Sequence, residues 1–303
     1  PDGADTIVIQ ENVDAAQEFD NTPITVLKGA AKGRFIRPAG LDISAGDMAL
    51  AKGTCLSARS IGLATAAGAT SAIVSALPRI GILSTGDELV AAGKTPGPGQ
   101  IISSNAAFLT AFVKGYGAEP VDLGIVKDRP GAVFDAVTAA ENLHLVVTTG
   151  GASVGSHDHV ASDLAAGALD FWKIAMRPGK PLIFGRFSGG LFLGLPGNPV
   201  SALILSLLIP RPMVAKMLGR PTDLPRRSAT IAHDLPANDL RRDFIRARRL
   251  PDGTIDARRR QDSSMLSVLA AADVILDRPA HDPAIKAGAP VQIIDLGQLD
   301  TLF

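Results

Sequence analysis

Between residues 79 and 148, apolar runs typical of β-strands alternate with segments of helical periodicity. Strands are expected at 79–84, 120–126 and 143–148, and helices at 104–114 and 130–140. Strands joined by helices pair in parallel, and right-handed crossovers place the helices on both faces of the sheet. The sequence therefore predicts a doubly wound, mostly parallel α/β sheet whose strand-end loops gather at one ligand-binding edge.

The 303 residues exceed what one compact core usually holds, so we expect several domains. Before the α/β segment, short strand-like runs occur at 6–10 and 24–27, and small residues at 58–68 predict a helix. Strands of a β-rich terminal domain are expected at 243–249, 274–276 and 291–295. We divide the chain into a β-rich remnant of an inserted domain, a linker with a helical segment, an α/β domain and a terminal β-rich domain, at residues 1–38, 39–77, 78–220 and 221–303.

Charge, cysteine content and apolar run length give no support to several classes of protein, although local basic patches remain possible. Lys+Arg and Asp+Glu balance at 30 each, which gives no reason to expect a nucleic acid or an anionic membrane as partner. The single cysteine, Cys55, can form neither an internal disulfide nor a cysteine zinc site, so we expect a reducing, cytoplasmic compartment and a small core residue. The longest apolar run, 202–209, is too short to span a bilayer, which takes about 18–20 residues.

In the arginine-rich run at 241–249, Arg246 and Arg248 share one strand face, which we expect to be solvated.

Two adjacent carboxylates, Asp87 and Glu88, follow the first strand in the motif Ser-Thr-Gly-Asp-Glu-Leu at 84–89. At the carboxyl end of a strand, such a pair can hold a hard cation or orient a water molecule. The alternative is a polar turn in which the aspartate caps a helix.

A glycine-rich loop, Thr-Thr-Gly-Gly-Ala-Ser-Val-Gly at 148–155, follows the third strand and precedes an expected helix. Glycines let the backbone approach an anion closely, and free N–H groups at a helix start attract phosphate. Asp158 would stand beside this pocket as a metal ligand or an acid–base group, although a tight strand-to-helix turn remains the alternative. His157 and His159 flank it, but no third spaced ligand supports a zinc site, so we favour loop histidines.

Two further loops could contribute to the same edge of the sheet. Arg177 and Lys180 bracket a Pro-Gly turn and could hold phosphate or an oxyanion, or they could form a solvated basic turn. The run Gly-Leu-Pro-Gly-Asn-Pro-Val-Ser at 194–201 is rigid and suits a binding wall. Asn198 or Ser201 can cap the apolar helix that follows it.

Taken together, these segments resemble the MoeA-type molybdopterin molybdenumtransferases, a family that includes the E domain of gephyrin. The resemblance covers nearly the whole chain and depends on the order and spacing of motifs at 84–89, 99–105, 150–158, 173–181 and 195–199, with support at 8–11, 42–46 and 261–266. It implies a MogA-like core fold. It also implies that molybdenum from molybdate is inserted into adenylylated molybdopterin, that AMP is released, and that magnesium takes part.

The resemblance also implies roles for individual residues. The catalytic residues would be Asp87, Asp158 and Lys180, with Asp42 as a further candidate carboxylate. The magnesium ligands would be Asp87, Glu88 and Asp158. The pterin-nucleotide pocket would be formed by Thr85, Gly86, Gly150, Gly151, Ser153, Gly155, Arg177, Pro196, Pro199 and Ser263.

Two departures from the family pattern bear on this reading. The Asp-Gly-Tyr-Ala and Thr-Gly segments, which reach the active site across a dimer interface in the family, do not occur here. Because the chain also begins at Pro1 without an initiator methionine or a signal peptide, we expect that an N-terminal part is missing. In the glycine-rich loop, Ala152 stands where many relatives have valine, which keeps the loop small.

The resemblance leaves two alternative functions and suggests two partners. A molybdopterin adenylyltransferase has the same core fold but typically carries Thr-Gly-Gly-Thr-Gly in the glycine-rich loop, and it alone would consume ATP. A non-enzymatic scaffold, like the E domain of gephyrin in its receptor-clustering role, is the second alternative. For the expected transferase we anticipate a homodimer and a possible contact with an adenylyltransferase.

Overall fold

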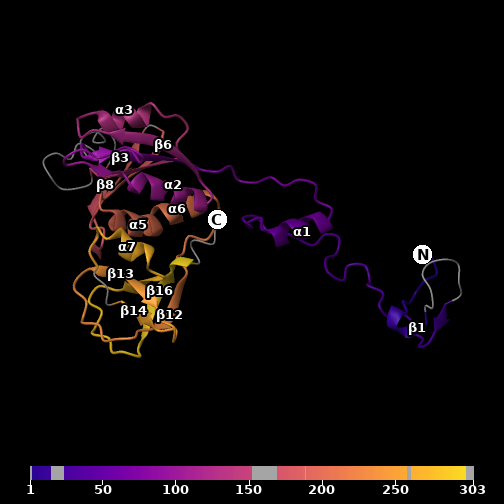
Figure 1. Cartoon of the computed structure of the whole chain (residues 1–303). Coiled ribbons are helices and arrows are strands. Elements are labelled where there is room, and N and C mark those ends of the chain that lie inside the picture. The colour runs from indigo at the N-terminus through magenta and orange to yellow at the C-terminus, as the bar shows by residue number, and fades with distance from the viewer. Residues whose placement is uncertain (1, 15–23, 152–168, 188, 258–260, 298–303) are drawn as a thin grey trace. The chain divides into compact units, whose positions relative to one another are not determined.

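A computed structural model of the chain describes residues 2–14, 24–151, 169–187, 189–257 and 261–297. Its contacts divide the chain into two compact units, Pro1–Ile73 and Val74–Phe303 (Figure 1). Each unit has its own secondary structure and is described separately.

The first unit contains few regular elements. They are η1 (Gln10–Asn12), the antiparallel pair β1 (Val13–Asp14) and β2 (Thr25–Val26), and α1 (Ala58–Ala66). The strand expected at 24–27 and the helix expected at 58–68 are confirmed, and a Ser57–Ser60 capping box starts the helix. The strand expected at 6–10 is wrong, because only two backbone bonds link this segment to residues 33–34: Gly33 N–H to the Asp5 carbonyl and Ile7 N–H to the Arg34 carbonyl, at 2.8 and 3.1 Å. The Thr6 side chain adds to this link by accepting from the Gly33 N–H and donating to the Ala31 carbonyl.

Cys55 is exposed, so its expected place in a core is wrong. It lies in an exposed segment that precedes α1 and has no regular structure. Local sequence could not reveal this, because a small apolar residue is compatible with either environment.

The second unit begins with a six-stranded sheet in the order β6-β3-β7-β11-β10-β8. Its strands are β3 (Arg79–Thr85), β6 (Glu119–Val126), β7 (Leu145–Thr149), β8 (Leu169–Lys173), β10 (Pro181–Phe187) and β11 (Gly190–Leu195). The four strands β6, β3, β7 and β11 pair in parallel, and β10 and β8 add an antiparallel edge. A small parallel pair, β4 (Leu89–Val90) and β5 (Ile101–Ile102), follows β3.

Helices cover both faces of this sheet, as predicted. They are α2 (Asn105–Gly115), α3 (Ala132–Thr138), α5 (Pro199–Leu208) and α6 (Pro210–Met217). Along β7, Leu145 and Val147 join the hydrophobic cluster under α2 and α5, whereas Val146 joins the cluster under α3. Figure 1 shows the sheet between α3 on one side and α2 and α5 on the other. The mostly parallel, doubly wound α/β prediction is therefore confirmed.

The helix starts differ from the expected caps. Ser104 precedes α2 and Asn198 precedes α5, but neither side chain caps its helix. Pro130 lies before α3 and not in its first turn. The residue that precedes the helix is Gly131, whose backbone is left-handed with φ +80°. The α5 start is stabilised instead by backbone groups: the Val200 N–H donates to the carbonyl of Ser263 at 3.2 Å.

The stretch Pro199–Met217, which joins α5 and α6, is the one helical segment of the described residues that is long and apolar enough to cross a membrane. It exceeds the short apolar run expected at 202–209, because α6 continues directly after α5. Half of it is buried inside the protein, and α5 contributes its apolar residues to the largest hydrophobic cluster. These features are those of a core helix.

The rest of the second unit forms a second sheet, in the order β12-β16-β15-β13-β14. Its elements are β12 (Arg226–Thr230), β13 (Arg242–Arg249), β14 (Ile255–Asp256), α7 (Leu266–Ala270), β15 (Val274–Arg278) and β16 (Pro290–Asp295). The strands expected at 243–249, 274–276 and 291–295 are confirmed. A short strand from the α/β segment, β9 (Met176–Arg177), pairs in parallel with β13, so the two sheets share a structural link.

The expectation that Arg246 lies on a solvated strand face is wrong. Its side chain is only 1% exposed, while Arg248 on the same strand is exposed as expected. The buried guanidinium donates to Gln261 Oε1 at 3.1 Å and to the Asp262 carbonyl at 2.8 Å. The strand pattern could not reveal this, because the covering segment lies about 15 residues further along the chain.

Candidate functional site

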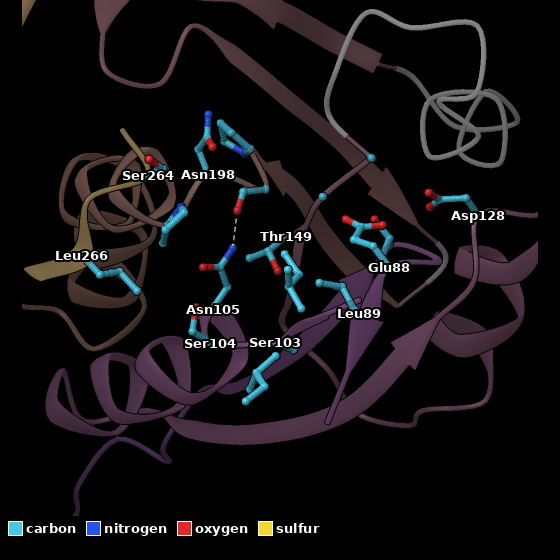
Figure 2. Close-up of a pocket in the computed structure, with 18 of the residues that line it drawn as sticks. Glu88, Leu89, Ser103, Ser104, Asn105, Asp128, Thr149, Asn198, Ser264 and Leu266 are labelled. Carbon is cyan, nitrogen blue, oxygen red and sulfur yellow. Dashed lines mark hydrogen bonds between the residues drawn. The ribbon is translucent and has the colours of Figure 1, made fainter. Parts of the chain in front are cut away.

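A pocket of about 800 Å³ opens at the carboxyl edge of the parallel strands, where ligand sites of open α/β sheets are found (Figure 2). Thr85 ends β3 and Thr149 ends β7, while α2 and α5 begin beside them. The lining residues are Thr85, Glu88, Leu89, Ile101, Ile102, Ser103, Ser104, Asn105, Asp128, Thr149, Gly150, Gly151, Pro181, Pro196, Gly197, Asn198, Pro199, Ser264 and Leu266. The predicted gathering of strand-end loops at one edge is therefore confirmed.

Gly150 directly follows β7 and lies against the end of β3. A Cβ atom on Gly150 would lie 2.3 Å from the backbone carbonyl oxygen of Thr85 and 2.8 Å from its hydroxyl oxygen. Its φ of +93° is also a conformation that other residues rarely adopt. Only glycine satisfies both conditions, so the glycine-rich motif here has a steric cause.

The Thr85 hydroxyl is a buried polar group without a hydrogen-bond partner among the described residues. The residue is 3% exposed and lines the pocket beside Gly150. Burying an unpaired hydroxyl is unfavourable unless another group satisfies it. A ligand that enters the pocket is one group that could do so after a small adjustment of the side chain.

Two helix N-termini border the pocket. Asn105 is the first residue of α2 and Pro199 is the first residue of α5. The Asn105 side chain, which is largely buried, donates from Nδ2 to the Gly197 carbonyl at 2.8 Å and so ties the two helix starts together (Figure 2). The first N–H groups of a helix lack partners within that helix and carry partial positive charge. This side of the pocket is therefore suited to an anion.

Carboxylates form the opposite end of the pocket. Figure 2 shows the Asp128 side chain directed toward Glu88, whereas Asn198, Ser264 and Leu266 lie at the other end. Asp87 is just outside the lining, and its Oδ1 accepts from the Asp128 backbone N–H at 3.4 Å. Among the residues that the structure describes, no group of three or more His, Cys, Asp or Glu residues forms a ready metal cage. Any cation here would share its coordination with a ligand or water.

Asp128, Ser264 and Leu266 are pocket residues that the sequence analysis did not assign to the site. For Asp128 a signal was present, because it follows β6 just as Asp87 and Glu88 follow β3, and parallel strands end at the same edge. For Ser264 and Leu266 the signal was the family-like motif at 261–266, which assigned the neighbouring Ser263 to the pocket. The chemistry of the two residues gives no further signal, since they reach the pocket only through the docking of the second sheet.

The loop that carries Ser264 is fixed by its own hydrogen bonds. Asp262 Oδ1 accepts from the Ser264 hydroxyl at 2.6 Å and from its backbone N–H at 2.8 Å. These bonds, the hydroxyl bond first, lower the pKa of Asp262. With Arg246 bound to the Asp262 carbonyl and the Ser263 carbonyl bound to α5, the terminal domain presents a defined wall to the pocket.

The structure brings six of the predicted site residues into the pocket lining: Thr85, Glu88, Gly150, Gly151, Pro196 and Pro199. Three others are sequence neighbours of lining residues: Gly86, Asp87 and Ser263. The expected site residues Ser153, Gly155 and Asp158, together with Ala152, His157 and His159, lie outside the described residues.

The remaining predicted residues lie elsewhere. Lys180 is exposed and immediately precedes Pro181, which lines the pocket. Arg177 does not face the pocket but pairs with Asp243 of the second sheet at 2.6 Å. Asp42 belongs to the first unit, where it is exposed.

Family models match three consecutive parts of the chain. Residues 1–68 match the MoeA N-terminal region (domain I and II), residues 81–216 match a probable molybdopterin binding domain, and residues 228–296 match the MoeA C-terminal region (domain IV). A crystal structure of a molybdopterin biosynthesis MoeA protein from Pyrococcus horikosii is similar, with a TM-score of 0.78 and 28% sequence identity. That similarity covers 96% of this chain and 72% of the Pyrococcus chain.

Curated relatives agree with these matches. The molybdopterin molybdenumtransferase of Haemophilus influenzae is 37% identical over 73% of this chain, and molybdopterin molybdenumtransferase 2 of Mycobacterium tuberculosis is 34% identical over 98% of it. The chain spans 54% of the Haemophilus protein and 75% of the Mycobacterium protein. With three successive family regions matched and a relative aligned over nearly its full length, this chain belongs to the MoeA family of molybdopterin molybdenumtransferases.

Proposed function

We propose that this chain inserts molybdenum from molybdate into adenylylated molybdopterin and releases AMP. The observation that carries the proposal is the pocket itself, which is lined by the Gly150–Gly151 backbone, by two helix N-termini and by the carboxylates Glu88 and Asp128. Such a pocket offers donors to an anion and acceptors to a cation, which suits a substrate that carries a pyrophosphate. The names of the relatives, molybdopterin molybdenumtransferase, support the same reaction.

In this proposal the phosphates of the substrate lie at the starts of α2 and α5. The free N–H groups at the start of α2, the remaining free N–H at the start of α5 and the close-packed glycine backbone would hold the pyrophosphate without a bulky side chain in the way. The pterin nucleotide would contact Thr85, Gly86, Gly150, Gly151, Pro196 and Pro199, with Ser153, Gly155 and Ser263 completing the pocket.

The carboxylates would hold magnesium, because carboxylate oxygens are the ligands that this cation prefers and it readily keeps water and phosphate oxygens as further ligands. Glu88 and Asp128 at the pocket, with Asp87 beside them, offer a suitable donor set, and Asp158 is the further proposed ligand. When bound, the cation would neutralise charge on the pyrophosphate.

Lys180, Asp87 and Asp158 would bind molybdate and position the reacting groups. We assign Lys180, exposed beside the pocket residue Pro181, to hold the molybdate dianion by its positive charge. Asp87 and Asp158 would orient the reacting groups and hold protons at their carboxylate oxygens. Arg177 was expected to share the anion, and its contacts assign it another role, described below.

The proposal extends to assembly and location. In the first unit, large apolar side chains are exposed, among them Ile7, Ile24, Leu27, Phe35 and Met48. Exposed apolar side chains in such number favour association, and we assign them to a homodimer interface. We also place the protein in the cytoplasm, where a molybdopterin adenylyltransferase would supply its substrate.

A single-turnover assay tests the function. Adenylylated molybdopterin, magnesium and molybdate are added to the protein, and AMP is measured together with active cofactor, with Asp158→Ala alongside. We expect AMP release that requires both molybdate and Asp158. Consumption of ATP in the presence of free molybdopterin would instead identify an adenylyltransferase, and binding without AMP release would show that this chain alone does not carry out the reaction.

Removing either pocket carboxylate should impair turnover more than binding. Glu88→Gln and Asp128→Asn keep the side-chain size but remove the charge that would hold magnesium. We expect the rate of AMP release at saturating substrate to fall on the order of 100-fold for each. Glu119→Gln, at an exposed surface ion pair with Arg79, should leave the rate unchanged. Equal rates for all three variants would contradict the assignment.

Asn105→Ala should weaken both the fold and ligand binding. The change removes the hydrogen bond to the Gly197 carbonyl and frees the loop that precedes α5. We expect the free energy of unfolding to fall by about 1–2 kcal/mol and the Kd of AMP, measured by calorimetry, to rise about tenfold. Lys114→Ala, on the exposed surface at the other end of α2, is the matched control and should change neither quantity.

A further inference from the structure

The segment from Met176 to Pro181 links the pocket wall to the second sheet. At its start, β9 pairs with β13, where Arg177 lies opposite Asp243, and the Arg242 N–H donates to the Ala175 carbonyl at 3.0 Å. At its end, Pro181 begins β10 and lines the pocket. A displacement of the second sheet would therefore be transmitted to the pocket within a few residues.

The Arg177 guanidinium binds acceptors of the second sheet rather than the pocket. Its Nη2 lies 2.6 Å from Asp243 Oδ2 and 3.3 Å from Asn238 Oδ1, and its Nη1 lies 3.3 Å from Asp239 Oδ2. The hydrogen bond to Asp243, a carboxylate that is itself largely buried, is the main cause of a raised Arg177 pKa. Arginine suits this place because its planar fork can reach several acceptors at once.

The acceptors are held in place by further bonds. Asn238 Nδ2 donates to the carbonyls of Arg241 and Pro279 at 2.8 and 2.7 Å. Asp239 accepts from the Arg241 side chain and backbone at 2.9 Å each, which together lower its pKa to about 2. Arg177 therefore binds acceptors that other hydrogen bonds hold in place.

The same strand, β13, leads to the part of the terminal domain that enters the pocket. Three residues after Asp243, Arg246 holds Gln261 and the Asp262 carbonyl, and the loop then places Ser264 and Leu266 in the pocket lining. On the other side of Arg177, Gly179 packs against Leu205 of α5, with a Cβ position 3.0 Å from it. Arg177 is thus connected to the pocket in two ways: along the chain to Pro181, and through Asp243 and β13 to the loop that carries Ser264 and Leu266.

We infer that Arg177 is a positioning residue, which binds Asp243 to hold the Lys180–Pro181 turn and the Ser264–Leu266 wall at a fixed separation across the pocket. This inference rests on the proposed function in so far as the pocket binds adenylylated molybdopterin. In this inference Arg177 binds the terminal domain, while Lys180 and the helix N-termini bind the anionic substrate.

A double-mutant cycle tests the inference in the AMP-release assay. Arg177→Met and Asp243→Asn each remove one side of the pair. We expect each change to raise the half-saturating substrate concentration about tenfold and to leave the limiting rate within about twofold. The double variant should be no worse than either single variant. Multiplied effects, or a reduced limiting rate for Arg177→Met alone, would overturn the inference, because Arg177 would then act on the substrate directly.

A second readout separates this inference from the proposed reaction. Amide hydrogen exchange in residues 261–266 should accelerate about tenfold in both single variants and in the double variant, because the loop loses its support. Arg249→Met is the matched control: Arg249 ends β13, the strand that carries Asp243, and the change breaks a surface pair with Asp295 of β16. It should leave exchange and kinetics unchanged. If the unaltered chain releases no AMP, the proposed reaction is wrong. The hydrogen-exchange rates of the three variants then still show whether the Arg177–Asp243 pair supports the loop at 261–266. Unchanged exchange in all variants would overturn the inference.

Discussion

Replacing Gly150 by alanine should abolish substrate binding while leaving a folded protein. The added methyl group would lie 2.3 Å from the Thr85 carbonyl oxygen, which is backbone and cannot rotate away. β3 is paired with β6 on one side and β7 on the other, so the strand end yields only if the sheet shifts. Any such shift moves Thr85 and Gly151 at the pocket. We expect the Kd of AMP to rise at least about 100-fold and the free energy of unfolding to fall by about 2–4 kcal/mol.

Gly253→Ala is the matched control for backbone strain. Gly253 has φ +84°, close to the +93° of Gly150, but a Cβ there would meet nothing within 4 Å. The free energy of unfolding of its alanine variant should fall only by the cost of the left-handed conformation, about 1–2 kcal/mol. This variant should bind AMP normally. Calorimetry and chemical unfolding on both variants separate strain from steric overlap. Normal AMP binding by Gly150→Ala would show that this close approach does not shape the site.

The core fold could be predicted because its cause is local. Every residue of β7 is buried, and Leu145, Val146 and Val147 reach both faces of the sheet, which is why the sequence shows an unbroken apolar run. The helix of residues 105–115 repeats its apolar side at helical spacing because one side packs on that sheet. Burial thus leaves a pattern that a reader of the sequence can recognise.

Most of the pocket residues that could be predicted lie at or shortly after the ends of strands. Glu88 and Gly150 do so, and the pocket contains both. Ser264 and Leu266 enter from a separate sheet, and Arg246 is buried by a segment distant in sequence. A cation in a strand pattern is equally compatible with solvent and with a buried partner, so its place follows from tertiary docking.

The same limit applies to Arg177 and to the helix caps. A Pro-Gly turn flanked by two cations suggests an anion site, but the carboxylate that binds Arg177 lies in a strand more than 60 residues away. Ser104 and Asn198 have the residue types that cap helices, yet the bonds that hold the starts of α2 and α5 come from Asn105 and from the Ser263 carbonyl. The residue types alone indicate which side chains could bind an anion or cap a helix. Contacts between segments distant in sequence determine which of them do so.

The second sheet should be most sensitive at Asp277. This carboxylate is almost completely buried and accepts from Arg226 Nε at 2.7 Å and from Arg242 Nε and Nη2 at 2.6 and 2.8 Å. Asp277→Asn keeps the shape and one acceptor oxygen but removes the negative charge that the two guanidinium groups share. We expect the free energy of unfolding to fall by about 3 kcal/mol and the Tm by about 10 °C. Asp234→Asn, at an exposed pair with Lys286, is the control and should shift the Tm far less.

The pH dependence of stability distinguishes the ion pair from simple loss of packing. Burial alone would raise the pKa of Asp277, but the hydrogen bonds from Arg242 and Arg226 outweigh it, so the pKa lies below its usual value of 3.8. A carboxyl whose pKa is lowered on folding stabilises the protein above its unfolded pKa and loses that contribution as the pH falls through the folded pKa. The stability difference between the unaltered chain and Asp277→Asn should therefore stay constant from pH 7 to about pH 5 and narrow below about pH 4. A difference that stays constant down to pH 3 in denaturant unfolding would mean that the charge of Asp277 does not contribute, and that packing alone explains the effect.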